Sequence, residues 1–338
     1  MIYKRRQAMS WLGAVALGNL SSSSWAQATV AKPQPVPKPK SVTKLAPRVR
    51  IVIPANAGGG WDQTGRALGA SMVAAGVADE IEYENKGGKG GTIGLSHYAE
   101  KYSNDSNTLL MGGMVMVGAV ALQKPAVDMS RVQPIARLTS DYLVMVVAAE
   151  SPIRNVSDLA GRMRSGLKGV PVAGGSAGGV DHMFAGVFAK GAGSNPEDLT
   201  YLPFAGGTEV VAAVLSGKAV VGISGYSEFS DQITSGKLRA IGVSSRQPVY
   251  GVPAIRNQGV DVNMANWRGV FTGQGVSAER QAEMMEAVHL ATAHESWRKV
   301  LKQNRWESSW LAGTAFGSFI DFDLTTARVM VHLLKLKA

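Results

Sequence analysis

A pattern of strand, glycine-rich loop and helix occurs twice in this chain. Residues 51–62 contain a short apolar run and a glycine-rich loop, and Gly59-Gly60-Trp61-Asp62 then opens a helical pattern. Residues 170–181 repeat this order and end in Gly178-Gly179-Val180-Asp181. Each loop is expected to present backbone N–H groups at a helix N-terminus, where the helix dipole favours an anion. Two such loops facing each other predict a cleft for a carboxylate; the alternative is two ordinary strand-to-helix turns.

Short apolar runs alternate with helical patterns along most of the chain. The runs predict strands at 49–53, 81–84, 108–111, 142–148, 170–173, 200–202, 219–223 and 238–243. Helices are predicted over 61–75, 92–102, 180–190, 208–215 and 226–235, and Ser157 is predicted to cap a further helix over 158–164. The C-terminal part is predicted to be mostly helical, over 278–293, 296–303 and 313–334. This alternation predicts an α/β fold with largely parallel sheets.

The N-terminal segment has the order of features that is typical of an export signal. Three basic residues, Lys4, Arg5 and Arg6, precede an apolar run over 8–20 that is too short to span a bilayer. Ser24 and Ala26 provide the small residues of a cleavage site. We therefore expect a cleaved signal peptide over 1–26, a Pro/Lys-rich linker over 27–47 and a periplasmic location. The chain has no cysteine, so neither a disulfide nor a lipid anchor on cysteine is expected.

The net charge of +10 does not indicate nucleic-acid binding, because most of it lies at the N-terminus. Nine of the 35 Lys and Arg residues precede residue 51, whereas none of the 25 Asp and Glu residues does. The remaining chain is nearly neutral and has no basic stripe.

One motif favours an enzyme. The segment 174–178 matches the G-x-S-x-G pattern of α/β-hydrolases, with Ser176 as its nucleophile. A triad also needs an acid and a histidine that returns to the serine from another loop. His182 follows only six residues later and is expected to point along the next helix. A secreted esterase is therefore the alternative hypothesis, whereas we expect no catalytic residue. The histidine spacing and the lack of cysteine predict no metal, and no cofactor is expected.

Six segments, taken together, resemble the tripartite tricarboxylate transporter receptor family, also called the Bug family of periplasmic binding proteins. One of them is Gly-Gly-Gly-Trp-Asp-Gln-Thr-Gly-Arg66, and another is Gly-Gly-Ser-Ala-Gly-Gly-Val-Asp-His182. The matching segments occur in order at 54–66, 84–92, 174–182, 201–207, 222–226 and 265–271. The similarity therefore extends over residues 48–338.

The resemblance implies a two-lobed type II periplasmic binding protein fold, the Venus flytrap fold, with the ligand in the cleft. Lobe 1 is expected to comprise 48–145 plus 246–338, and lobe 2 to comprise 146–245. The implied function is a monomeric receptor that captures a small carboxylate, with a tricarboxylate such as citrate favoured. Membrane subunits of a tripartite transporter are the implied partner, and a membrane sensor kinase is the alternative partner.

The resemblance also implies which residues bind the ligand, mainly through backbone amides of the two loops. They are Ala57, Gly58, Gly59 and Trp61 on one side, Gly175, Ser176, Ala177 and Gly178 on the other, and Phe204, Gly206, Gly207, Ser224, Gly225 and Tyr226 around the remainder. Arg66, Lys89 and Arg268 are candidate counter-charges. Lys89 departs from the family pattern, which has a small residue there. Asp62 and Asp181 are expected to cap free N–H groups near the helix N-termini.

Overall fold

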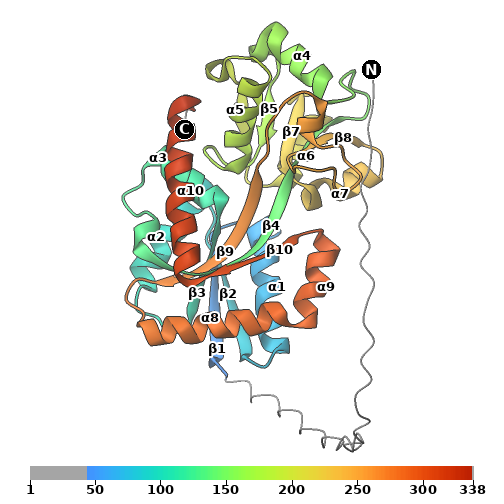
Figure 1. Ribbon diagram of the computed structural model, residues 1–338. Helices are drawn as coiled ribbons and strands as arrows, with labels where there is room; N and C mark the ends of the chain where they lie inside the picture. Colours follow the sequence, from blue (N-terminus) through green and yellow to red (C-terminus); the bar gives the residue numbers. More distant parts are fainter. Residues whose placement is uncertain (1–43, 337–338) are drawn as a thin grey trace, which may run out of the picture. The chain divides into compact units, whose positions relative to one another are not determined.

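The computed structural model describes residues 44–336 (Figure 1). The predicted signal peptide and residues 27–43 of the predicted linker lie outside the described residues. The strands are β1 (Ala46–Ile53), β2 (Ala78–Asn85), β3 (Thr108–Gly113), β4 (Val132–Ala148), β5 (Val172–Gly174), β6 (Tyr201–Pro203), β7 (Val221–Gly225), β8 (Leu238–Val243), β9 (Ala265–Gly273) and β10 (Glu307–Ala312).

These strands form two sheets that share β4. The first sheet has the order β2-β1-β3-β9-β4, and β10 also pairs with β4. The second sheet has the order β6-β5-β7-β4, and β8 pairs with β4 as well. β4 belongs to both because it is 17 residues long: residues 132–142 pair with β9 and residues 143–148 pair with β7 and β8.

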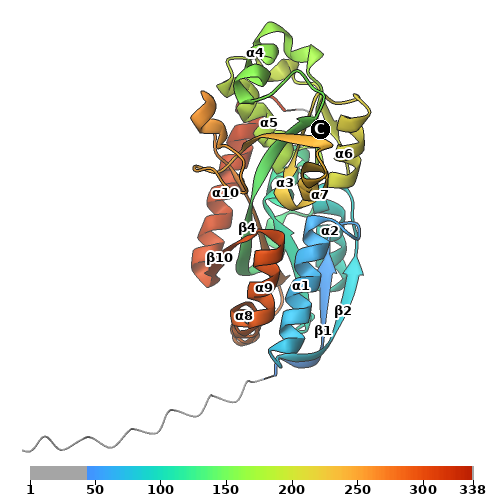
Figure 2. The same cartoon turned by 90° about the vertical axis from the view of Figure 1, so that its right-hand side faces the viewer.

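The prediction of largely parallel sheets is wrong. β1 is parallel to β2 and β3, and β5 is parallel to β6 and β7, but every pairing of β4 and β9 is antiparallel. The physical reason is the path of the chain. β4 takes it from the first sheet into the second, and β9 brings it back alongside β4, so the two strands run in opposite directions. Figure 1 shows both as long strands between the two groups of elements, and Figure 2 shows β4 from the side.

Helices surround both sheets. They are α1 (Gly60–Ala74), α2 (Thr92–Lys101), α3 (Met114–Gln123), α4 (Val156–Gly166), α5 (Val180–Gly191), α6 (Gly207–Leu215), α7 (Tyr226–Thr234), α8 (Ala278–Ala293), α9 (Glu295–Asn304) and α10 (Gly313–Leu333), together with the 3₁₀ turn η1 (Lys89–Gly91). α1 packs against α8 and α9, whereas α10 packs against α3 and β4. The N-cap prediction for α4 is wrong: the side chain of Asn155 accepts the hydrogen bond from the Asp158 amide, and Ser157 Oγ donates to the Gln258 carbonyl.

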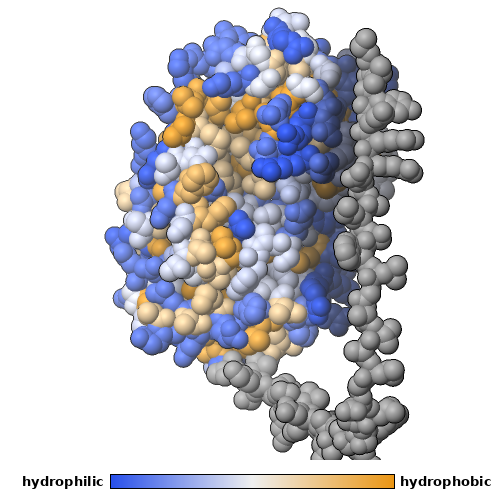
Figure 3. Space-filling view, viewed as in Figure 1, coloured by the Kyte–Doolittle hydropathy of each residue, from blue (hydrophilic) through white to orange (hydrophobic). Residues whose placement is uncertain are grey.

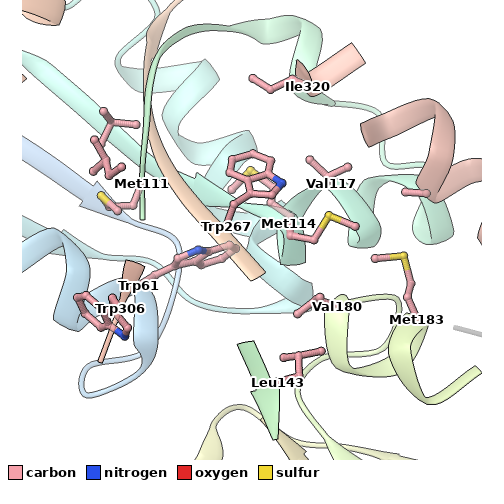
Figure 4. Close-up of a cluster of buried hydrophobic side chains, with 14 of the residues drawn as sticks. Trp61, Met111, Met114, Val117, Leu143, Val180, Met183, Trp267, Trp306 and Ile320 are labelled. Atoms are coloured by element: carbon pink, nitrogen blue, oxygen red, sulfur yellow. The ribbon is translucent and has the colours of Figure 1, made fainter. Parts of the chain in front are cut away.

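A large hydrophobic core lies between the first sheet and its helices and continues into α5 of the second group. Figure 4 shows part of it, where Trp61 from α1 lies among Met111, Trp267 and Trp306. Trp267 donates a hydrogen bond from Nε1 to Asp323 of α10 and packs edge-on against Phe316. Trp61 is buried in this core, and its burial anchors the start of α1, which follows the first glycine loop.

Some apolar side chains remain on the surface of α10. Phe322, Val329 and Leu333 are 69%, 50% and 59% exposed and recur at helical spacing along one face of the helix. Figure 3 shows apolar side chains along the part of the surface where α10 lies. Among residues 44–336, no helix combines the length and the apolar character that a membrane span requires.

Candidate ligand-binding site

A cavity of about 770 Å³ lies where the loops of the two sheets meet. Its lining comes from the loop between β1 and α1, from η1, from the loop between β5 and α5, and from the segment between β6 and α6. α3 contributes Val115 and Gln123, and β7, α7 and β9 contribute Ser224, Glu228, Asn266 and Arg268. The volume falls within the range of about 300–1,000 Å³ that small-molecule sites occupy. The two repeated glycine loops therefore contribute to one cavity.

The first loop is closed by a buried carboxylate. Asp62 is 4% exposed and accepts hydrogen bonds from the Gly58 amide at 2.9 Å, from Arg66 Nε at 3.0 Å and from Asn85 Nδ2 at 2.9 Å. Burial works to raise the pKa of Asp62, but the hydrogen bonds from Arg66, Gly58 and Asn85 outweigh it and lower that pKa. Asp62 is thus an ionised structural anchor that caps the loop.

The second loop is closed in a similar way. Asp181 Oδ2 accepts from the Gly175 amide at 2.7 Å, and His182 Nδ1 accepts from the Gly178 amide at 3.0 Å. The imidazole of His182 also stacks on the Tyr201 ring, with 4.1 Å between the two ring centroids. Burial lowers the pKa of His182 to about 4, so the ring is neutral at pH 7 and accepts through Nδ1. The predicted capping by Asp62 and Asp181 thus has a geometric counterpart in each loop.

Several backbone amides that were expected to bind the ligand donate hydrogen bonds to carboxylates of the protein itself. Besides Gly58 and Gly175, the Gly206 amide donates to Glu209 at 3.1 Å and the Gly207 amide donates to Glu228 at 2.7 Å. The expectation that both glycine loops offer all their backbone amides to a ligand is therefore wrong, because the Gly58 and Gly175 amides donate to Asp62 and Asp181. Carboxylates outcompete water for such amides because they form charge-assisted hydrogen bonds.

Several amides at the cavity remain available, among them three from the repeated glycine loops. The N–H groups of Gly60, Ser176 and Ala177 donate to no other residue within 44–336, and all three residues line the cavity. Gly60 is the first residue of α1, so its N–H is one of those that a helix leaves without an internal partner. These donors come from both repeated loops.

Arg268 is a buried cation in the cavity wall. Its exposed fraction is 1%, and its guanidinium lies over the Trp306 ring at 4.7 Å. Nη1 donates to Thr64 Oγ1 at 3.3 Å, and Nη2 donates to Asp141 Oδ2 at 3.4 Å. Both bonds are long for a guanidinium that has five N–H donors. Arg268 therefore retains donor capacity toward the cavity.

The acid behind Arg268 is unusual. Asp141 is 1% exposed, and its Oδ1 has no hydrogen-bond partner among the described residues. Burial raises the pKa of Asp141 to about 7; Arg268 opposes this rise, and Glu228 adds to it. The charge of Arg268 is thus only partly balanced.

Ten of the predicted residues line the cavity. They are Gly59, Trp61, Lys89, Gly175, Ser176, Ala177, Phe204, Gly206, Ser224 and Arg268. Lys89, in η1, is exposed and forms no ion pair with another described residue. Trp61 is only 8% exposed, so it is both a core residue and a wall of the cavity.

Seven predicted residues do not line the cavity. Ala57 and Gly58 are exposed at the outer side of the first loop, and Gly178 packs against Gly118 and Leu122 of α3. Gly207 and Gly225 lie directly against Glu228 and Asp141, respectively. The other two are aromatic or basic side chains with partners elsewhere: Tyr226 packs on Tyr250, and Arg66 pairs with Asp62.

Some cavity residues were not expected from the sequence. Asn56, Gln123, Glu228 and Asn266 contribute polar side chains, and Asp181 lines the cavity besides capping its loop. Glu228 stands in the first turn of α7, where an acid is ordinarily explained by the helix dipole. Nothing in the sequence indicates that Glu228 accepts a hydrogen bond from the Gly207 amide.

The geometry around Ser176 does not form a triad. His182, the nearest histidine in the sequence, is directed to the Gly178 amide and to Tyr201. His289 packs on Trp310, and His294 caps α9. Within 44–336, no histidine is hydrogen-bonded to Ser176.

The fold and the cavity are those expected of a solute-binding protein. Comparison with known proteins agrees: the family model described as "Tripartite tricarboxylate transporter family receptor" matches residues 68–332. The chain belongs to this family of periplasmic binding proteins and is a solute-binding receptor, not an esterase.

Three relatives illustrate how far the similarity extends. The chain is 25% identical over 259 residues to the UPF0065 protein in the tcbD-tcbE intergenic region of Pseudomonas sp. (strain P51), covering 75% of this chain and 76% of that protein. The structure of the periplasmic binding protein BugD has a TM-score of 0.76 at 21% identity and covers 86% of this chain and 98% of its own. MatC from Rhodopseudomonas palustris with bound malate has a TM-score of 0.73 at 23% identity, covering 84% and 99%. The predicted α/β periplasmic binding protein fold is confirmed.

Proposed function

We propose that this receptor is exported to the periplasm and encloses a small carboxylate in the cavity between its two glycine loops. A tricarboxylate such as citrate is the first candidate, and the membrane subunits of a tripartite transporter are the partners that receive it. The observation that carries this proposal is the pairing of two cations, Lys89 and Arg268, with free amides from both loops in one cavity. The malate in the structure of MatC supports a carboxylate ligand.

The predicted lobes fit this proposal. Residues 48–145 plus 246–338 form one lobe and 146–245 the other, so that one loop comes from each, and the chain crosses between them in β4 and before β9. A change of angle between the sheets then opens and closes the cavity by hinge motion. The change of β4 from the first sheet to the second at residues 142–143 supports this assignment.

The proposed ligand contacts are specific. A carboxylate lies against the Arg268 guanidinium and the amides of Ser176 and Ala177, while Lys89 provides a second, solvent-exposed charge. Guanidinium groups bind carboxylates through two parallel hydrogen bonds, which fixes the orientation of the ligand. The Ser176 hydroxyl is a further donor at the same loop.

The test is a thermal-shift and calorimetric screen of the chain from Gln27 onward. The panel comprises citrate, other di- and tricarboxylates, amino acids and aromatic acids. A ligand at 100 times its Kd adds about 2.7 kcal/mol to the free energy of unfolding. If no carboxylate binds, the proposal is wrong.

A matched pair of variants tests the role of the exposed cation. Lys89→Ala is expected to weaken binding by about 2- to 5-fold, the size of an exposed charge interaction of about 0.5–1 kcal/mol. Lys86→Ala is the control, because Lys86 is an exposed lysine of the same segment that does not line the cavity. Equal losses in both variants would indicate a general charge effect rather than a ligand contact.

Export and delivery have their own tests. N-terminal sequencing of the protein from a periplasmic extract should begin at Gln27. Deletion of the receptor should abolish uptake of its ligand if it serves a transporter. Unchanged uptake with loss of a transcriptional response would instead favour presentation to a membrane sensor kinase.

A further inference from the structure

The cavity wall contains acids as well as cations. Asp181 from α5 and Glu228 from α7 line it on the side of the second sheet, and Lys89 and Arg268 line it on the side of the first. Asp181 is 7% exposed, so what remains accessible of it faces the cavity. The lining thus has two formal positive and two formal negative charges, and Asp141 lies directly behind Arg268.

Each of the two acids is fixed by only one of its oxygens. Asp181 Oδ2 accepts from the Gly175 amide and Glu228 Oε2 accepts from the Gly207 amide, both at 2.7 Å. The second oxygen of each side chain accepts no hydrogen bond from residues 44–336, and neither oxygen is enclosed by protein. Two oriented acceptors therefore open on the cavity.

This arrangement is unfavourable for a ligand that consists of carboxylates alone. An ionised carboxylate only accepts hydrogen bonds, so a second carboxylate beside it finds repulsion and no donor. A ligand hydroxyl or ammonium group, in contrast, donates to such an oxygen and relieves the repulsion between the protein's own acids. That repulsion is present in the site: burial raises the pKa of Asp181 to about 7, and the charges of Glu228 and Asp141 contribute to the rise.

We propose that the free oxygens of Asp181 and Glu228 recognise a hydrogen-bond donor on the ligand, so that the receptor selects carboxylates that also carry a hydroxyl or ammonium group. One end of the ligand binds Arg268 and the free amides, and the donor group binds the two acids. This inference rests on the proposed function, because it assumes a carboxylate in the cavity, and it defines which carboxylates are accepted.

The test compares ligands that differ only in the donor group. Calorimetry at pH 8 measures Kd for succinate, malate and aspartate, and for tricarballylate and citrate. Malate or aspartate should bind about 10-fold or more tightly than succinate, because a hydrogen bond to a charged acceptor is a strong one. The comparison of malate with aspartate identifies whether the donor is a hydroxyl or an ammonium group.

Two variants assign the preference to the acids. Glu228→Gln and Asp181→Asn should each reduce the preference for malate over succinate to less than about 3-fold, because the amide group loses the charge that favours a donor. Glu209→Gln is the matched control: Glu209 also holds backbone amides of the 205–207 segment but does not line the cavity. It should leave the preference unchanged.

The outcomes separate this proposal from the one on which it rests. Equal affinity of the unmodified protein for succinate and malate would overturn the proposal and leave a carboxylate receptor in place. A malate preference that survives in Glu228→Gln would overturn the assignment to the acids, even if Asp181→Asn does not fold. A protein that binds none of the five carboxylates overturns the proposed function itself.

Discussion

Replacement of Arg268 by methionine tests the electrostatics of the cavity wall most sharply. Methionine has a similar volume, but it lacks the guanidinium that lies over Trp306 and leaves the buried Asp141 without its counter-charge. Removal of one partner of a buried ion pair ordinarily costs about 3–5 kcal/mol. Because the Asp141–Arg268 contact is long, at 3.4 Å, we expect about 3 kcal/mol at pH 8.

The cost should depend on pH in a defined direction. Burial already raises the pKa of Asp141 to about 7 and Arg268 opposes that rise, so the variant raises this pKa further. The carboxyl is then neutral at pH 5.5 in both proteins, and the loss there should be that of a volume-conserving substitution, less than about 1.5 kcal/mol. Above pH 7 the unmodified protein ionises Asp141 beside a cation, whereas the variant must keep a proton on it.

Urea denaturation of the ligand-free protein at pH 5.5 and pH 8 measures this difference. The double variant Asp141→Asn/Arg268→Met removes both charges and should recover most of the stability lost at pH 8. Equal losses at both pH values, or a double variant no more stable than the single one, would refute the reasoning. In binding assays, Arg268→Met should weaken carboxylate affinity by about 10-fold or more, since a charged hydrogen bond contributes about 1.5–3 kcal/mol.

Three further predictions concern the loops and the buried acids. Gly118→Ala places a methyl group against the Gly178 carbonyl oxygen, with an overpacking cost of about 1–3 kcal/mol. If the ligand-bound protein keeps this contact, ligand binding measured by calorimetry should weaken by about 10-fold, and unchanged affinity would show that the contact is not part of the bound form. Asp62→Ala should lower the free energy of unfolding by about 1–3 kcal/mol, because three donors lose their acceptor, and it should change the choice of ligand little. An unchanged melting temperature with lost binding would contradict this. The ligand-free protein should lose stability as pH rises from 5 to 8. The folded-state pKa values of Asp141 and Asp181 are raised to about 7, so the folded protein binds more protons than the unfolded chain until the pH passes these values. A urea midpoint that stays constant over this range would be inconsistent with those values.

Much of the fold could be predicted from local pattern. The βα units around the two glycine loops have apolar runs, helical periodicity and glycines at the helix starts, and α1 and α5 begin within one residue of their predicted positions. The segment of α3 was not predicted, because Met114–Gln123 is apolar on nearly all sides and has no helical period. β9 was missed because its central placement depends on pairing with β3 and β4, far away in the sequence.

The site was predictable only in part, for a related reason. Glycine loops and the unusual Lys89 are visible in the sequence, so their presence at the cavity could be expected. The contact of Arg268 with Asp141 joins residues 127 positions apart, and no local signal indicates it. The hydrogen bond from the Gly207 amide to Glu228 likewise depends on how α6 and α7 pack, whereas the bond from the Gly206 amide to Glu209 lies within the first turn of α6.

A crystal structure of the chain with bound malate would show whether both glycine loops hold the ligand. We predict one ligand carboxylate within hydrogen-bonding distance of the Arg268 guanidinium and of the Ser176 and Ala177 amides, enclosed between the two loops. Malate bound at another surface, with the loops separated and no ligand between them, would contradict the account.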